Sequence, residues 1–236
     1  MPNDYFRFKQ FTIWQDRCAM KVSTDGVLLG AWTECANASR ILDIGTGTGI
    51  LALIAAQRNP TALIDAVEID EASAEQAGEN VAASPWPDRV TVFHADVRRW
   101  DRDARYDLIV CNPPFYKGHQ ASSDARTALA KHEMSLDLAA LMQAVVGLCT
   151  DQGRACMIIP IDRLEELIIL AAAHGFSLSR KCLVLYLSNK TAKRVLVELT
   201  RKFNGQEEIS ELVIEQTPGE FSPEYRALLS DLVLHF

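Results

Sequence analysis

The sequence predicts an α/β fold in which a mostly parallel sheet carries helices on both faces and an antiparallel hairpin near its C-terminus. Short apolar runs alternate with helical patterns between residues 40 and 173, which is typical of βαβ units. Three successive runs have acidic residues at or near their ends, where open α/β sheets bind ligands. Two later runs, Cys182–Ser188 and Arg194–Phe203, are joined by Asn189–Lys193, which is too short to hold a helix, so they are expected to form the hairpin.

Length and composition indicate one globular domain. The chain has 236 residues, of which 48% are hydrophobic and 23% charged, and these are usual values for a domain with a substantial core. There is no internal repeat or low-complexity tract that would mark a boundary. We therefore expect a single domain over 1–236, with an N-terminal extension over 1–39, a catalytic core over 40–203 and a C-terminal addition over 204–236.

The cysteines, the histidines and the apolar runs exclude several classes of protein. The six cysteines are scattered without a C-x-x-C pair and the five histidines are equally dispersed, so we expect reduced thiols and no metal site. No apolar run approaches the ~18–20 residues of a membrane span, and the N-terminus has no secretory signal. A cytoplasmic protein without membrane contact is expected.

The charge is acidic overall but unevenly distributed. A net charge of -7 argues against non-specific coating of nucleic acid, although an enzyme can still engage RNA through a local patch. Basic residues gather between Arg180 and Lys202, and a second set consists of Lys117, Arg126 and Lys131. A solvated face and a contact with RNA are equal explanations for each cluster.

The first elements precede the core. Aromatic and polar residues alternate from Phe6 to Trp14, which predicts a short strand or hairpin. Either Thr24 or Asp25 can then cap a helix that runs from Gly26 to Trp32.

The stretch Arg40–Gln57 is the centre of the predicted fold. A short apolar strand, Ile41–Ile44, leads into glycines at positions 45, 47 and 49, and then into a segment with good helix propensity. Such a turn gathers backbone N–H groups at a helix N-terminus, and glycine lets a ligand approach the main chain without meeting a Cβ. The turn predicts a nucleotide-like ligand. The dinucleotide fingerprint G-x-G-x-x-G does not fit, because Ile50 stands where its third glycine belongs.

Two further strands carry acids at their ends. The run Ala62–Asp70 offers Glu68 as the first choice, and Asp70 as the second, for accepting hydrogen bonds from ribose hydroxyls. A helix over Ala72–Ala83 follows, and then a strand over Arg89–Asp96. Because the carboxyl ends of parallel strands meet at one edge of a sheet, these acids are expected to lie in one crevice.

The fourth strand, Tyr106–Cys111, leads directly into Asn112-Pro113-Pro114-Phe115, the most specific string in the chain. The prolines fix the backbone and remove two donors, which leaves the Asn112 amide and the Pro113 carbonyl as preset acceptors. Phe115 offers a flat face. Together these groups suit a planar exocyclic NH2 that is held by hydrogen bonds while its ring is stacked.

After a polar loop over Tyr116–Met134, the remaining pattern predicts seven more helices and strands. They are a helix over Leu136–Cys149, a strand over Ala155–Pro160, a helix over Arg163–Ala173, the two strands of the hairpin, one further strand over Gln206–Glu215 and a helix over Phe221–Phe236.

The string Asp43-Ile-Gly-Thr-Gly-Thr-Gly49 resembles the first motif of the class I S-adenosylmethionine-dependent methyltransferases, and Asn-Pro-Pro-Phe is similar to the catalytic motif of their amino-group branch. The resemblance covers nearly the whole chain. It implies a Rossmann-like fold with a mostly parallel seven-stranded sheet, S-adenosyl-L-methionine as cofactor, and an N-terminal extension that closes over the cofactor.

The same resemblance implies roles for particular residues. It makes Asn112, Pro113, Pro114 and Phe115 catalytic. It places Asp96 against the cofactor's adenine amino group, with the backbone of Val97 beside a ring nitrogen. The full set implied to bind cofactor is Lys21, Thr24 (with Asp25 as a further candidate), Asp43, Gly45, Thr46, Gly47, Gly49, Glu68, Ile69, Asp96, Val97 and Asn112.

Three segments resemble a narrower group, the compact bacterial methyltransferases that modify adenine N6 beside the anticodon of a valine tRNA. These segments are Met20–Trp32, Lys131–Glu133 and Pro223–Asp231. The resemblance implies tRNA as partner, and the candidates for contacting it are Lys117, Arg126, Lys131, Lys190, Lys193 and Arg194. One departure is the aliphatic-rich tail after Asp231, where this group is expected to have an aromatic residue.

Several alternatives remain open on the residues alone, which reach only as far as an amino-group methyltransferase. The same fold could act on guanine N2 of ribosomal RNA, adenine N6 of DNA or a protein glutamine. An alternative of another class is a catalytically inactive cofactor-binding module that interacts with RNA. A nicotinamide oxidoreductase is disfavoured by the glycine spacing and by Asn-Pro-Pro-Phe. The oligomeric state is left open.

Overall fold

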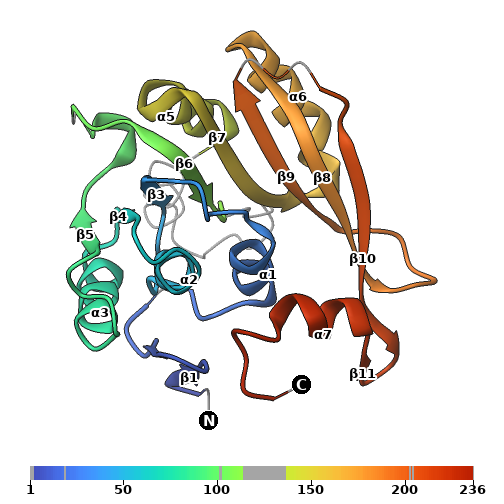
Figure 1. Ribbon diagram of the computed structural model, residues 1–236, viewed down its shortest axis with the longest axis horizontal. Coiled ribbons are helices and arrows are strands. Elements are labelled where there is room, and N and C mark those ends of the chain that lie inside the picture. Colours follow the sequence, from blue (N-terminus) through green and yellow to red (C-terminus); the bar gives the residue numbers. More distant parts are fainter. Residues whose placement is uncertain are drawn as a thin grey trace, which may run out of the picture.

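The computed structural model describes residues 3–18, 20–100, 103–113, 137–201, 203 and 205–235 (Figure 1). Its strands are β1 (Tyr5–Arg7), β2 (Thr12–Trp14), β3 (Arg40–Ile44), β4 (Leu63–Glu68), β5 (Val90–His94), β6 (Tyr106–Cys111), β7 (Cys149–Pro160), β8 (Phe176–Leu187), β9 (Arg194–Arg201), β10 (Glu208–Thr217) and β11 (Glu220–Phe221). Its helices are α1 (Thr24–Trp32), α2 (Ile50–Arg58), α3 (Glu71–Ala82), α5 (Leu138–Leu148), α6 (Leu164–Ala173) and α7 (Pro223–Leu229), with 3₁₀ turns η1 (Val97–Arg99) and η2 (Ile161–Arg163).

The main sheet has the strand order β11-β10-β8-β9-β7-β6-β3-β4-β5. Strands β5, β4, β3, β6 and β7 pair in parallel, β9 is antiparallel to both β7 and β8, and β10 is parallel to β8. The predicted α/β fold, a mostly parallel sheet closed by an antiparallel hairpin, is confirmed. Strands β3 to β9 supply the seven predicted strands, and β10 and β11 extend the sheet beyond the hairpin.

Two predicted boundaries at the C-terminal end needed correction. The helix predicted over Phe221–Phe236 covers only Pro223–Leu229. Phe221 belongs to β11, and Ser222 caps the helix by accepting a hydrogen bond from the Tyr225 N–H. Beyond the helix, Val233 forms an isolated bridge with Phe8, so the chain there pairs with the N-terminal segment. The predicted loop Tyr116–Met134 lies outside the described residues.

Helices cover both faces of the sheet and create two cores. One core includes Leu28 of α1, Leu53 of α2 and Leu229 of α7. The other includes Leu141 of α5 and Leu167 of α6. The buried strands are apolar on both sides, as parallel strands between two helical layers must be.

Parallel topology places several chain segments at one edge of the sheet. The strands β3, β4, β6 and β7 all end at this edge. Pro160, the last residue of β7, lies opposite Arg194, the first residue of β9, so the turn between β8 and β9 also lies there. The carboxyl edge is where open α/β sheets bind ligands.

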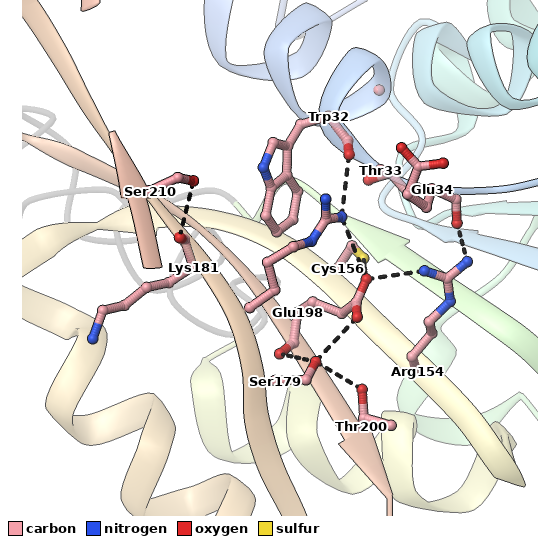
Figure 2. A network of polar contacts seen from close by, with 12 residues as sticks. Trp32, Thr33, Glu34, Arg154, Cys156, Ser179, Lys181, Glu198, Thr200 and Ser210 are labelled. Carbon is pink, nitrogen blue, oxygen red and sulfur yellow. Dashed lines mark hydrogen bonds and ion pairs between the residues drawn. The ribbon is translucent and has the colours of Figure 1, made fainter. Parts of the chain in front are cut away.

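The C-terminal end of α1 is tied to the sheet by a charged network (Figure 2). Glu198 of β9 accepts hydrogen bonds from Arg154 at 2.9 Å and from Arg180 at 3.4 Å. Arg180 also donates to the Trp32 carbonyl at 3.2 Å and lies over the Trp32 ring, 3.7 Å from its centroid. Arg154 donates to the Glu34 carbonyl. Each arginine therefore joins Glu198 to the backbone at the end of α1.

Replacing the shared carboxylate should destabilise the protein strongly. The Glu198 side chain is only 13% exposed. Glu198→Ala leaves the guanidinium groups of Arg154 and Arg180 without their shared carboxylate in this largely buried place, so we expect a loss of about 3 kcal/mol in the free energy of unfolding. Urea denaturation measures this loss. The matched control is Glu211→Ala on β10, an exposed acid whose removal should change stability by about 0.5 kcal/mol or less. Equal effects of the two substitutions would contradict the role given to the network.

Candidate active site

A cavity of about 410 Å³ opens at the carboxyl edge of the sheet. It is bounded by five segments that are far apart in the sequence. They are 20–23 with Gly26, 44–48 with Ile50 and Leu51, 67–70 with Ser73, 95–98, and Cys111 with Asn112. The ends of β3, β4, β5 and β6 therefore meet the start of α1 around one space.

The glycine turn forms the floor of this cavity. Gly45, Gly47 and Gly49 have φ angles of 69°, 55° and 85°, in the left-handed region that favours glycine. Gly45 and Gly47 line the cavity. Gly49 does not line it: it begins α2 as the N-cap residue, and a Cβ there would lie 3.6 Å from that of Ala77 in α3. At Gly45 and Gly47 the turn thus offers main chain, without a side chain, to a bound molecule.

Asp43 lies beneath the turn and does not line the cavity. Its Oδ2 accepts hydrogen bonds from Thr46 Oγ1 at 2.5 Å and from the Ala52 N–H at 3.1 Å. Its Oδ1 is buried and has no hydrogen-bond partner among the described residues. Burial raises the pKa of the Asp43 carboxyl to about 7, although the hydrogen bonds from Thr46 and Ala52 act in the opposite direction. The carboxyl therefore supports the turn from inside the protein.

Glu68, at the end of β4, joins the turn to the next strand. Its Oε2 accepts a hydrogen bond from the Gly47 N–H at 2.9 Å, and its Oε1 accepts from the N–H groups of Ile69 and Asp70 at 2.9 and 3.0 Å. Both Glu68 and Asp70 line the cavity. Asp70 additionally caps α3, where its carboxylate accepts from the Ser73 N–H. Of the two acids, Glu68 is the one held directly against the glycine turn.

Asp96 is paired with a residue that sequence reasoning missed. The guanidinium of Arg98 donates to both Asp96 carboxylate oxygens, with Nε–Oδ1 at 2.8 Å and Nη2–Oδ2 at 2.7 Å. Hydrogen bonds from Arg98 lower the pKa of Asp96 below its ordinary value. Asp96, Val97 and Arg98 all line the cavity. The only signal in the sequence was the D-x-R spacing after the third strand.

The start of α1 forms the opposite wall, and here one prediction was wrong. The helix is capped by Ser23, whose Oγ accepts from the Gly26 N–H at 3.2 Å, and not by Thr24 or Asp25. Ser23 has the extended backbone of an N-cap, whereas Thr24 is already helical. Lys21 lines the cavity and donates to the Asn3 carbonyl at 3.0 Å. Thr24 lines a neighbouring cavity of about 420 Å³ instead.

Asn112 completes the cavity from the end of β6. It is partly buried and lines the cavity together with Cys111. A Cβ built on Gly26 would lie 3.8 Å from its Nδ2, so the amide faces the first turn of α1. Pro113 follows and is buried. The predicted residues Pro114, Phe115, Lys117, Arg126 and Lys131 lie outside the described residues.

Many of the predicted basic groups have acidic partners. Arg194 Nε lies 2.7 Å from Asp25 Oδ2. Lys181 pairs with Glu207 at 2.7 Å, and Arg180 belongs to the Glu198 network. Lys190 and Lys193 are exposed in the turn between β8 and β9, at the carboxyl edge of the sheet.

Neither a metal centre nor a membrane segment emerges from the described part of the chain. No three His, Cys, Asp or Glu residues among the described ones are grouped so that they could hold a metal ion. None of the described helices is long and apolar enough to span a membrane.

Comparison with known proteins identifies the class of the fold and site. Residues 24–137 match the model of the methyltransferase small domain. The structure is similar to that of a predicted O-methyltransferase from Agrobacterium tumefaciens, with a TM-score of 0.68 and 20% identity over 90% of this chain and 98% of that one. At this identity the structural likeness shows the fold alone. The fold is that of the class I methyltransferases, and residues 24–137 match a domain of that class.

Sequence relatives narrow the class to a family. The chain is 45% identical to a tRNA1(Val) (adenine(37)-N6)-methyltransferase of Tolumonas auensis, over 99% of this chain and 98% of the relative. It is 43% identical to a protein of the same name from Bacteroides thetaiotaomicron, over 100% and 99% of the two chains. The chain therefore belongs to the tRNA1(Val) (adenine(37)-N6)-methyltransferase family.

The buried carboxyl under the turn should make stability depend on pH. Because the pKa of Asp43 is about 7 in the folded protein and about 4 in an unfolded chain, the folded state binds more protons between these values, and stability falls as pH rises through this window. Asp43→Asn removes this dependence. Between about pH 5 and about pH 8, we expect the free energy of unfolding of the variant to rise relative to that of the wild type, because only the wild type loses stability through Asp43. Urea denaturation at the two pH values tests this, and an unchanged difference would show that the carboxyl is ionised throughout.

Proposed function

We propose that this protein methylates N6 of an adenine in the anticodon loop of a valine tRNA, in the cytoplasm, with S-adenosyl-L-methionine as methyl donor. The observation that carries the proposal is that Asn112 and the Gly45–Gly47 turn open onto one cavity. A motif for gripping an amino group therefore faces a turn for holding a nucleotide-like cofactor. The substrate is taken from the names of the relatives that match the chain over its full length.

The chemistry of the cavity fits the cofactor. Glu68 accepts three hydrogen bonds from backbone N–H groups. Because a carboxylate has about four acceptor sites, Glu68 can still accept a hydrogen bond from a ribose hydroxyl. Asp96, kept ionised by Arg98, can accept from the adenine amino group, with Val97 beside the ring. Apolar side chains such as Ile69 complete the walls. We assign Gly45, Thr46, Gly47, Gly49 and Asp43 to shaping the turn, and Lys21 and Thr24 to the segment that covers the cofactor.

This assignment gives each part of the single domain a role. Segment 1–39 contributes Lys21 and the start of α1 to the cavity, 40–203 holds the catalytic core, and 204–236 is an addition that packs on α1 through α7. We propose that the extension and the addition together close one side of the site.

The catalytic work of the chain is to orient an amino group. The cofactor would supply an electrophilic methyl group, which would bond to the amino nitrogen as its bond to the sulfonium sulfur breaks, and one amino hydrogen would then leave as a proton to solvent. An aromatic NH2 is a poor nucleophile because its lone pair is delocalised into the ring. When the Asn112 amide oxygen and the Pro113 carbonyl accept both amino hydrogens, they favour a pyramidal nitrogen. Its lone pair then points out of the ring plane and toward the cavity. The gain is positioning and electrostatics, and it requires no covalent intermediate with the enzyme.

We assign contact with RNA to an aromatic residue after Asn112 and to a set of basic residues. Phe115 would stack on the target base, a contact worth roughly 1–3 kcal/mol in other single-strand binders. Pro114 would fix the direction of that ring. We propose phosphate contacts for Lys117, Arg126, Lys131, Lys190 and Lys193. Arg194 was also predicted to contact RNA, and we assign it to holding α1 because it is paired with Asp25.

The substrate is tested by supplying tritiated S-adenosylmethionine with tRNA, ribosomal RNA, DNA and protein in turn. We expect label in tRNA, and mass spectrometry of its nucleosides should show N6-methyladenosine only when the protein is present. Label confined to ribosomal RNA, duplex DNA or protein would replace tRNA by that substrate. Absence of label in all four, with cofactor binding retained, would indicate an inactive binding module.

Removing the amide at the end of β6 should abolish most of the transfer. Asn112→Ala deletes one of the two acceptors for the amino group, and we expect kcat to fall by about 10² or more while the fold persists. Steady-state kinetics with tRNA measures the loss. Asn37→Ala, an exposed asparagine away from the cavity, is the control and should keep wild-type kinetics. A variant at position 112 with unchanged kcat would remove Asn112 from the mechanism.

A further inference from the structure

Gly26 is a cavity residue that neither the motif nor the mechanism uses. It lies in the first turn of α1, two residues after Thr24 begins the helix, and lines the cavity beside Asn112. A Cβ built on it would lie 3.7 Å from Ile50 Cγ2, 3.7 Å from Ser23 Oγ and 3.8 Å from Asn112 Nδ2. All three distances are ordinary van der Waals contacts, so the protein itself has room for a side chain there.

The fold gives no reason for glycine at this position. Its backbone is helical, which any residue adopts, and glycine is a poor helix former compared with alanine. The next glycine of the same helix is different. A Cβ at Gly30 would lie 2.8 Å from Ile54 Cδ1, so that glycine is required for the packing of α1 on α2. Gly26 meets no such obstacle among the described residues, and its reason must lie in what the cavity holds.

The direction in which a side chain at position 26 would point shows which part of the cavity glycine leaves open. It would extend between Ile50, the first residue after the glycine turn, and Asn112, the acceptor for the substrate amino group. The space in front of Gly26 therefore lies between the start of α2, directly after the glycine turn, and the Asn112 amide.

The helix that carries Gly26 is held at both ends and has little freedom to retreat. Asp25, the preceding residue, is paired with Arg194 at 2.7 Å. At the other end, Arg180 donates to the Trp32 carbonyl and lies over its ring. A methyl group added at Gly26 would therefore project into the cavity instead of displacing α1.

We propose that Gly26 keeps open the space in which the methyl group of the cofactor meets the amino group of the substrate. This inference rests on the proposed function, because it assumes that Asn112 holds the accepting nitrogen. It predicts that a side chain at position 26 blocks transfer without weakening either the fold or the binding of the cofactor alone.

The test is Gly26→Ala, with Gly78→Ala in α3 and Gly147→Ala in α5 as matched controls. A Cβ at either control position meets no described atom within 4 Å, other than those of its own helix backbone and chain neighbours. Tm is measured for all three variants, affinity for S-adenosylhomocysteine by calorimetry, and kcat/KM with tRNA. We expect Tm at or above that of the wild type for all three, and affinity within about threefold. Only Gly26→Ala should lose about tenfold or more in kcat/KM.

Each other outcome overturns the inference. Activity of Gly26→Ala within about twofold of wild type would show that the space is not needed. A parallel loss of S-adenosylhomocysteine affinity would assign the space to the cofactor alone, and a fall in Tm would show that the fold requires glycine. If the wild-type protein labels another substrate instead of tRNA, the proposed function fails, and the same variants measured with that substrate still decide the role of Gly26.

Discussion

The site depends on two carboxylates that hold the glycine turn from opposite sides. Asp43 accepts from Thr46 and from the Ala52 N–H, and so fixes the turn to the first residues of α2. Glu68 accepts from the Gly47 N–H and so fixes the turn to the neighbouring strand. Left-handed glycines have many alternative conformations, and ordering them costs more entropy than ordering other residues. The two carboxylates select one conformation, and this gives the cavity a defined floor before any ligand binds.

The opposite wall is a helix whose position is set by charge. Glu198 shares two arginines that both reach the backbone at the end of α1, and Arg194 is paired with Asp25 near its start. The pairs of Glu198 are largely buried; such pairs add little net stability compared with apolar packing, but they fix geometry because a displaced charge would be left unpaired. The close packing of Gly30 on Ile54 and these charged contacts together position α1. The width between α1 and the end of β6 is fixed by these contacts.

Sequence reasoning predicted the cavity-lining residues whose positions depend on short spacings, and it missed those whose positions depend on the folded structure. The glycine turn, Glu68 and Asn112 are fixed by short spacings within or just after a strand, and parallel topology brings strand ends together without further information. Arg98 was missed because nothing in the sequence shows whether an arginine turns toward Asp96 or toward solvent. Gly26 resembled an ordinary helix residue until Asn112 was placed beside it. The cluster Arg180–Lys202 was predicted as a basic surface because the acids that pair with it are distant in sequence or belong to other strands.

The N-terminal and C-terminal segments outside the core both contribute to the position of α1. Residues 204–236 add β10 to the sheet and return as α7, which packs against α1 (Figure 1). The chain ends are then joined, since Phe8 bridges Val233 and the Lys9 N–H donates to the Leu232 carbonyl at 2.8 Å. Residues 20–23 lead from this junction into α1 along the cavity wall. Because both chain ends converge on the start of α1, a shift of either would change the gap beside Asn112. A reaction that relies on positioning alone, without a covalent intermediate, gains most from fixing that gap.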